Sequence, residues 1–252
     1  MTGLAPVLPD FYRLIRLATV GSTNDEAKRL AQSGAPEGTL VWALEQTAGR
    51  GRRGRPWQSP PGNLYLSLLL RPAVSAGQAA QLGFVAALAL GDALEPLIGA
   101  GHALRFKWPN DVLLDGRKLA GILLESETAA AVAVAFVVIG MGINLAVAPS
   151  GTEFPAISLA EAGIRGVSPG VLLDAFAHHF QGWYRRWRAE GFAPVRLAWL
   201  ARAGGLGEAV LVRLERATLS GRFLDLDEEG ALLLESDQGR RRIAAGEVFP
   251  AG

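Results

Sequence analysis

The most informative absence in this 252-residue sequence is cysteine, which does not occur at all. Without cysteine the chain can form no disulfide, thiol nucleophile or cysteine metal site, and its redox compartment stays open. The three histidines, His102, His178 and His179, show no companion carboxylate or cysteine at the spacing that a metal site requires. We therefore assign them structural or solvated roles.

A strong net charge is also lacking, since 25 basic and 24 acidic residues leave a formal charge of +1. This balance argues against a generally basic nucleic-acid-binding protein. The N-terminus has no apolar stretch after a basic start, as a signal peptide would. The longest uncharged stretch, residues 128–152, is interrupted by glycine, asparagine and proline, and predicts a buried strand rather than a membrane span. We expect a cytoplasmic protein with neither a membrane nor a nucleic acid as partner.

Lysine is scarce, because only Lys28, Lys107 and Lys118 among the 25 basic residues are lysines. Arginine is therefore the default cation of this chain. A lysine supplies a compact, titratable ammonium group that the planar guanidinium of arginine cannot imitate. The three lysines are for this reason of functional interest.

Local patterns predict a mixed α and β region in residues 1–203. The stretch from Thr23 to Glu26 has capping-box spacing and predicts a short helix after Ser22. Asp115-Gly116 between two apolar runs is typical of a β-hairpin. Further strands are expected at residues 40–45, 64–70 and 132–139, the last of them ended by Gly140 and Gly142, and further helices at residues 76–94 and from Ser168 onward.

The C-terminal residues have a different character. Gly204-Gly205-Leu206-Gly207 is the best linker in the chain. The short alternating strands expected beyond it are residues 209–214, 219–225, 231–235 and 240–243. A small all-β barrel over residues 204–252 is therefore predicted after a mixed α and β domain over residues 1–203, which makes the fold class α+β.

The most unusual segment is TAGRGRRGRPW, residues 47–57, with arginine at positions 50, 52, 53 and 55. Its glycines match the spacing of a dinucleotide fingerprint, but that motif needs a helix directly afterwards. Pro56 and the prolines that follow prevent one. The segment is instead an exposed loop dense in positive charge. Because ordering costs about 1–2 kcal/mol per residue and like charges repel, we expect disorder until ligand anions close the loop over the site.

A second segment, Lys107-Trp108-Pro109-Asn110-Asp111, places a cation and two oxygen donors just before the hairpin. Such oxygens suit Mg²⁺, although an ordinary turn after proline is an equally good explanation. Lys118 follows the hairpin turn on a strand, which positions an ammonium group better than a loop does. Gly121 interrupts that strand, as a bulge or where a ligand comes close.

These cations would allow two anions to meet. Two unit charges at about 4 Å repel by about 4 kcal/mol at an effective dielectric constant near 20. Cations must be interleaved before a carboxylate and a nucleoside triphosphate can react. This is the physical requirement for forming an acyl-adenylate.

Five ordered motifs make the chain resemble the bacterial biotin–protein ligase family, in the short form without the N-terminal DNA-binding domain. The motifs are Ser22-Thr23-Asn24, Gln46 with residues 48–54, residues 107–111, residues 117–121 and residues 140–144. The resemblance implies a mixed-sheet catalytic domain of the biotin/lipoate ligase type over residues 1–203 and an SH3-like barrel over residues 204–252. It also implies a two-step reaction with ATP, biotin and Mg²⁺. Biotin is activated as biotinyl-5'-AMP and then transferred to a lysine of the biotin carboxyl carrier protein of a carboxylase.

The resemblance also implies roles for individual residues. Those expected to bind biotin are Ser22, Thr23, Asn24, Gln46, Arg50, Gly51, Arg52 and Lys118, of which Arg50, Arg52 and Lys118 are also the expected catalytic residues. Those expected to bind ATP are Arg53, Trp57, Lys107, Asn110, Asp111 and Asn144, with Asp111 also expected to hold Mg²⁺.

Two further expectations follow from the resemblance, and two alternatives to it stay open. Only 21 residues precede Ser22, so regulation by direct DNA binding is not expected. Family members occur as monomers and dimers, and a homodimer is slightly favoured here. The alternatives are a lipoate–protein ligase, which shares the fold and the adenylation chemistry, and a non-catalytic module that binds nucleic acid through the arginine loop.

Overall fold

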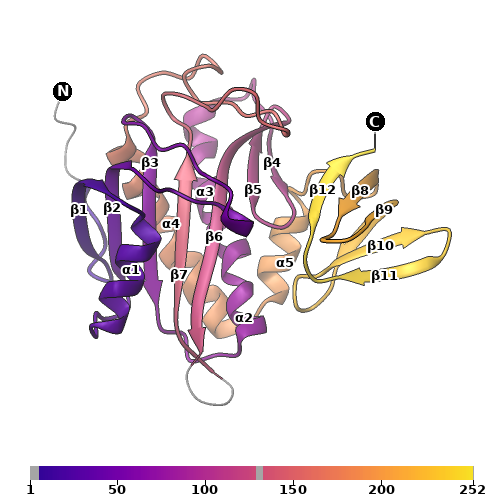
Figure 1. Ribbon diagram of the computed structural model, residues 1–252, viewed down its shortest axis with the longest axis horizontal. Helices are drawn as coiled ribbons and strands as arrows, with labels where there is room; N and C mark the ends of the chain where they lie inside the picture. The colour runs from indigo at the N-terminus through magenta and orange to yellow at the C-terminus, as the bar shows by residue number, and fades with distance from the viewer. Residues whose placement is uncertain (1–5, 129–132, 252) are drawn as a thin grey trace.

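A computed structural model describes residues 6–128 and 133–251, and it contains two β-sheets that lie side by side (Figure 1). The larger sheet has seven strands in the order β1-β2-β3-β7-β6-β5-β4. Its strands are β1 (Arg13–Val20), β2 (Thr39–Gln46), β3 (Leu64–Leu70), β4 (Leu104–Lys107), β5 (Asp111–Leu114), β6 (Arg117–Thr128) and β7 (Val134–Ile143). Only β1 and β2 pair in parallel among these neighbours, so the sheet is mixed and the predicted α+β class is confirmed.

Helices cover both faces of the large sheet (Figure 1). Helix α1 (Thr23–Gln32) makes the crossover between the parallel strands β1 and β2, and packs Ala27 and Ala31 on one face. The other face carries α2 (Ala76–Ala80), α3 (Leu82–Ile98), α4 (Pro169–Glu190) and α5 (Ala193–Leu200). The stretch Ala76–Ile98 is long and apolar enough to cross a membrane, yet 78% of its most apolar window is buried in the fold. It is therefore explained as a core helix.

The structure corrects the expected end of the third strand. Val132 lies outside the described residues, and β7 continues through Gly140 and Gly142 to Ile143. Both glycines are paired with β3 and β6. They permit close approach rather than ending the strand, because a Cβ on Gly140 would lie 2.0 Å from Asn24 Oδ1. Gly121 likewise stays paired within β6.

Other local predictions had mixed outcomes. The hairpin is confirmed, with Asp115 and Gly116 at φ 50° and 74° between β5 and β6. The capping box at Thr23 is wrong, since Ser22 is the N-cap of α1 and makes no side-chain capping bond. The predicted helix at residues 76–94 is divided at Gln81 into α2 and α3. Strand β1 and helix α5 were not predicted.

The second sheet contains five antiparallel strands in the order β11-β10-β9-β8-β12. Its strands are β8 (Ala209–Arg213), β9 (Thr218–Leu226), β10 (Leu232–Ser236), β11 (Gly239–Ile243) and β12 (Glu247–Pro250), of which β12 was not predicted. The two sheets are joined by specific contacts: Trp108 Nε1 donates to Gly230 O at 3.0 Å, and Arg196 pairs with Asp225. We propose that the boundary between the catalytic domain and the barrel lies between residues 203 and 204.

Candidate active site

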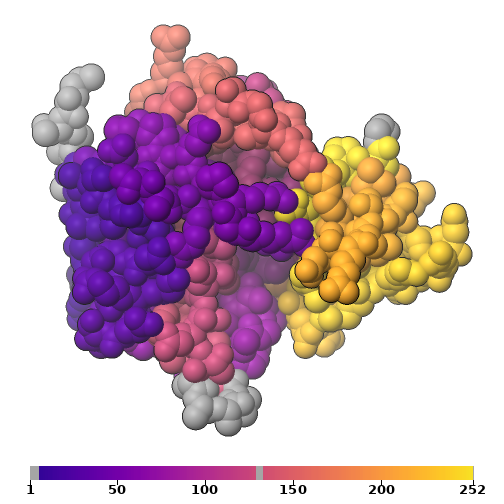
Figure 2. Space-filling view, viewed as in Figure 1, coloured from indigo at the N-terminus to yellow at the C-terminus, as the bar shows by residue number. Residues whose placement is uncertain are grey.

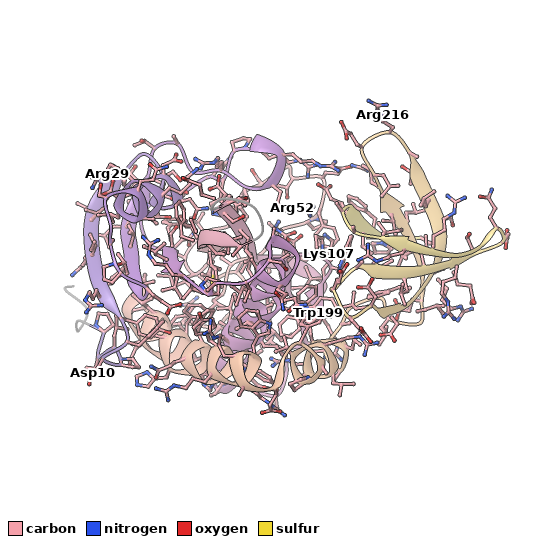
Figure 3. All side chains as sticks on the ribbon, turned by 90° about the horizontal axis from the view of Figure 1, so that it is seen from below. Asp10, Arg29, Arg52, Lys107, Trp199 and Arg216 are labelled. Atoms are coloured by element: carbon pink, nitrogen blue, oxygen red, sulfur yellow. The ribbon has the colours of Figure 1, made fainter. Side chains whose placement is uncertain are left out.

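One cavity of about 490 Å³ opens where the ends of β2, β6 and β7 meet the loop after β2 and the C-terminal sheet. Figure 2 shows the segment around residue 50 reaching across a hollow toward the C-terminal strands. Figure 3 places Arg52 and Lys107 between the two sheets. All predicted site residues except Arg53 line this cavity, namely Ser22, Thr23, Asn24, Gln46, Arg50, Gly51, Arg52, Trp57, Lys107, Asn110, Asp111, Lys118 and Asn144.

One end of the cavity is polar and neutral. Gln46 Oε1 accepts from the Thr23 backbone N–H at 2.8 Å and from Thr23 Oγ1 at 3.0 Å. Gln46 Nε2 donates to Ser59 Oγ at 2.9 Å, which fixes which end of the amide faces α1. Behind them the buried Ser67 hydroxyl contacts Thr23 Oγ1 at 2.8 Å and Asn24 Oδ1 at 2.6 Å. This connected set suits a neutral, hydrogen-bonding head group.

Trp57 forms an aromatic wall over the glycines of the two central strands. A Cβ on Gly142 would lie 2.3 Å from Trp57 Nε1, and a Cβ on Gly121 would lie 3.1 Å from the same ring. Only glycine at position 142 leaves room for the indole against this strand. Lys118 Nζ lies 5.4 Å from the centre of the Trp57 ring, so the wall also contacts the cationic end.

The opposite end of the cavity is cationic. Lys107 Nζ lies 2.9 Å from Asp111 Oδ2, and Lys118 Nζ lies 2.6 Å from Asp111 Oδ1. Burial alone would raise the pKa of Asp111, but the two ammonium groups outweigh it and hold that pKa below its usual value. The hairpin register explains the arrangement, because Asp111 begins β5 and Lys118 lies near the start of the paired strand β6. Two lysines against one carboxylate leave an excess positive charge at this end.

The same geometry bears on Mg²⁺, which the sequence assigns to Asp111. Each oxygen of this carboxylate already faces an ammonium group. Within residues 6–128 and 133–251, no group of three or more histidine, cysteine or acidic side chains is arranged to hold a metal. The residues at Asp111 therefore do not fit a protein-held magnesium ion, and this expectation gains no support from the structure.

The arginine loop reaches the C-terminal sheet. Arg52 donates to Asn110 Oδ1 at 3.3 Å and to Gly246 O at 3.1 Å, and Arg55 pairs with Glu247 at 2.9 Å. The acceptors of Arg52 are both neutral, and burial lowers the pKa of its guanidinium. Arg52 thus brings into the cavity a charge that no carboxylate neutralises directly.

Two predicted arginine roles are not supported by this geometry. Arg53 has a left-handed backbone with φ 56°, is exposed, and is not among the residues that line the cavity. Arg50 lines the cavity but pairs with Asp25 and Glu125 of the same chain. The charge of Arg50 is therefore offset by carboxylates of the protein itself.

Asn144, which the resemblance assigns to the nucleotide, lines the cavity. It is buried, and its Nδ2 lies 3.3 Å from Ile157 O and 3.5 Å from Lys118 O. These contacts hold the loop after β7 against the start of β6. The amide is thus already engaged with the backbone in this arrangement.

Some residues of the cavity were missed by sequence reasoning. Phe154, from the loop after β7, and Phe249, from β12, have ring centroids 6.4 Å apart. Lys107 Nζ lies 4.6 Å from the centre of the Phe154 ring and 5.7 Å from that of Phe249. No local pattern marks either residue, because they meet only when the two sheets are brought together.

Comparison with known proteins identifies the family of the chain. Residues 17–144 match the family described as "Biotin/lipoate A/B protein ligase family", and residues 205–249 match "Biotin protein ligase C terminal domain". The chain belongs to the biotin–protein ligase family. The first match contains the predicted motifs of this ligase from Ser22 to Asn144, and the second covers all but the final residue of its five C-terminal strands.

Individual relatives support this family assignment. The ligase is 48% identical over 242 residues to "Biotin--[acetyl-CoA-carboxylase] ligase" of Paracoccus denitrificans, covering 94% of this chain and 100% of that protein. It is similar to the biotin protein ligase of Aquifex aeolicus in complex with biotin and ATP, with 29% identity, a TM-score of 0.80, and 95% and 98% of the two chains covered. The Leishmania major biotin protein ligase with biotinyl-5-AMP has 27% identity, a TM-score of 0.66, and 92% and 99% coverage.

Proposed function

We propose that this ligase activates biotin with ATP and transfers it to a lysine of a biotin carboxyl carrier protein. The observation that carries the proposal is the polarity of the cavity, which is neutral around Thr23 and Gln46 and cationic around Lys118, Lys107 and Arg52. A neutral head group fits the first end. A carboxylate and a triphosphate need the second.

In the first step a biotin carboxylate oxygen bonds to the α-phosphorus of ATP, and pyrophosphate leaves with the electrons of the broken P–O bond. Lys118 donates to the oxygens on which negative charge accumulates, and Arg52 approaches them from the loop. Both cations are held before the reaction, Lys118 by Asp111 and Arg52 by Gly246 O. Their orientation therefore costs no reorganisation in the transition state. Mg²⁺ that accompanies ATP would be held by phosphate and water oxygens.

In the second step the neutral ε-amine of the carrier lysine attacks the acyl carbon, AMP leaves, and the amine loses a proton. The loop bearing Arg52 shields the reactive anhydride from water until the carrier binds. This requires the loop to stay closed after pyrophosphate leaves. Its contacts with Gly246 and Glu247 of the C-terminal sheet support that role for the barrel.

Pyrophosphate release with ATP and either biotin or lipoate tests the first step, and labelled-biotin incorporation into a carrier domain tests the second. We expect release with biotin, little release with lipoate, and labelling that disappears when the acceptor lysine of the carrier is replaced by arginine. Release with lipoate alone would instead identify a lipoate–protein ligase. Release with neither acid would refute adenylation.

A further inference from the structure

Two carboxylates in a cluster of four charged side chains beside the cavity bind Arg50, the first arginine of the loop. Arg50 Nη1 and Nη2 donate to the two carboxylate oxygens of Asp25 at 2.5 and 2.7 Å, which is a bidentate pair. Arg50 Nη2 also donates to Glu125 Oε2 at 2.9 Å. Asp25 belongs to α1 and Glu125 to β6, so one guanidinium connects the loop to two rigid elements.

Glu125 at the same time orients a side chain that lines the cavity. Its Oε2 accepts from Asn24 Nδ2 at 2.7 Å, and its Oε1 accepts from Lys28 Nζ at 3.1 Å. Asn24 Oδ1 in turn accepts from Ser67 at 2.6 Å, so the amide has one fixed orientation. One carboxylate therefore links the wall of the neutral end to the start of the loop.

The cluster has no net charge, because it contains two acidic and two basic side chains. Asp25 and Glu125 balance Lys28 and Arg50, and Lys28 Nζ also lies 3.1 Å from Asp25. Arg50 keeps no uncompensated charge for a substrate, whereas Arg52, two residues later, faces only the neutral acceptors Asn110 Oδ1 and Gly246 O. The geometry separates an arginine that holds the loop from one that receives an anion.

We propose that Asp25 and Glu125 are positioning residues of the ligase: they anchor the loop through Arg50 in the arrangement that places Arg52 over the cavity. The effect on catalysis rests on the proposed function, but the anchoring does not. Without the anchor, substrate binding must also supply the free energy of ordering the loop. The Michaelis constants then rise more than kcat falls.

Trypsin cleavage after Arg52 and Arg53 in the substrate-free protein tests the anchor directly. Asp25→Asn and Glu125→Gln keep side-chain size and remove one carboxylate each. We expect cleavage about three- to tenfold faster in each, as for the loss of one partly exposed ion pair. The matched control is Glu26→Gln on the same helix, whose partner Arg29 lies away from the loop. It is expected to cleave at the wild-type rate.

A double-mutant cycle with Arg50→Gln separates anchoring from other roles of Glu125. If Glu125 acts through Arg50, adding Glu125→Gln to Arg50→Gln changes cleavage by less than about twofold. Fully additive effects would overturn the proposal, as would wild-type cleavage rates in both single variants. Since the side chain of Asp25 is 55% exposed, Asp25→Asn keeps the test valid even if Glu125→Gln fails to fold.

Kinetics then connect the anchor to the reaction. The KM values for biotin and ATP in pyrophosphate release should rise about three- to tenfold in Asp25→Asn, with kcat reduced by less than about twofold. A loss of folded protein alone would lower kcat and leave KM unchanged, which would contradict positioning. If wild-type protein releases no pyrophosphate with biotin, the proposed function fails, while the proteolysis result still decides the anchor.

Discussion

At the scale of single residues, the four arginines of the loop are not equivalent. Arg50 is paired with two carboxylates and Arg55 with Glu247, while Arg52 is half-buried and meets only neutral acceptors. Arg53 is exposed. Four identical side chains within six positions thus have different environments, because the surrounding elements supply different partners. An arginine's role follows from the charge that it leaves uncompensated.

This division predicts the outcome of two neighbouring substitutions. Arg52→Gln should lower the rate of pyrophosphate release about 10- to 100-fold, since a charged hydrogen-bond donor to the reacting anions is lost. Arg53→Gln should change the rate by less than about twofold. Both substitutions replace arginine by glutamine, so the two variants differ only in the position at which the guanidinium is lost. Equal losses in the two variants would contradict the assignment.

The ion pair between Asp25 and Arg50 predicts that stability depends on pH in the acidic range. Hydrogen bonds from Arg50 lower the pKa of Asp25 to about 2. A depressed pKa means that this carboxylate stabilises the fold above its unfolded pKa of about 3.9, and that the contribution is lost as pH falls through about 2. Carboxylate NMR titration should therefore give a pKa near 2 in the wild type, rising toward the unfolded value in Arg50→Gln. An identical titration in both proteins would disprove the pairing.

At the scale of elements, two glycines in the central strand β7 leave space for side chains that line the site. Gly142 leaves the space that the Trp57 indole fills, and Gly140 leaves the space for the Asn24 amide. Both segments that fill these spaces come from outside the strand. The glycines therefore couple β7 to the loop and to α1.

Gly142→Ala should disturb this packing. The added methyl group would lie 2.3 Å from Trp57 Nε1, so the indole must move. We expect biotin affinity in equilibrium dialysis to fall about tenfold, as for an overpacked core position. Gly182→Ala, at an exposed position of α4 with open space around it, should instead stabilise the protein by about 0.5–1 kcal/mol in urea unfolding and leave biotin binding unchanged. Unchanged biotin affinity in Gly142→Ala would refute the role assigned to the indole wall.

Elements with strong local signals were predicted from the sequence, and those defined by distant partners were not. The Asp115-Gly116 turn and the Ser168 cap of α4 carry their own chemistry. Strand β1 pairs only with β2, and β12 only with β8, so neither has a local marker. The motif residues of the cavity lie together as the sequence motifs suggest, whereas the pairing of Arg50 with Asp25 and Glu125 could not be read from the sequence, because neither carboxylate belongs to a motif.

At the scale of the whole molecule, the two sheets enclose the site together. Trp108 of the segment that carries Lys107 and Asp111 donates to Gly230 O of the C-terminal sheet, and the loop contacts Glu247. Reactive adenylate is thus formed between surfaces that both belong to this chain. Any amine of the protein near the opening would be exposed to it.

The three lysines are placed so that they react little with the adenylate, because each lies within 3.1 Å of a carboxylate oxygen. A protonated, paired ammonium group is a poor nucleophile toward an acyl-adenylate.

Arg53→Lys would place an exposed amine on the loop. We expect this variant, incubated with biotin and ATP without carrier, to become biotinylated at position 53. Its high local concentration should make labelling about tenfold faster than at Arg216→Lys, at the tip of the turn between β8 and β9 (Figure 3). Peptide mass spectrometry locates the label. Equal labelling at positions 53 and 216 would mean that the adenylate reacts only after leaving the site, and that the loop does not retain it.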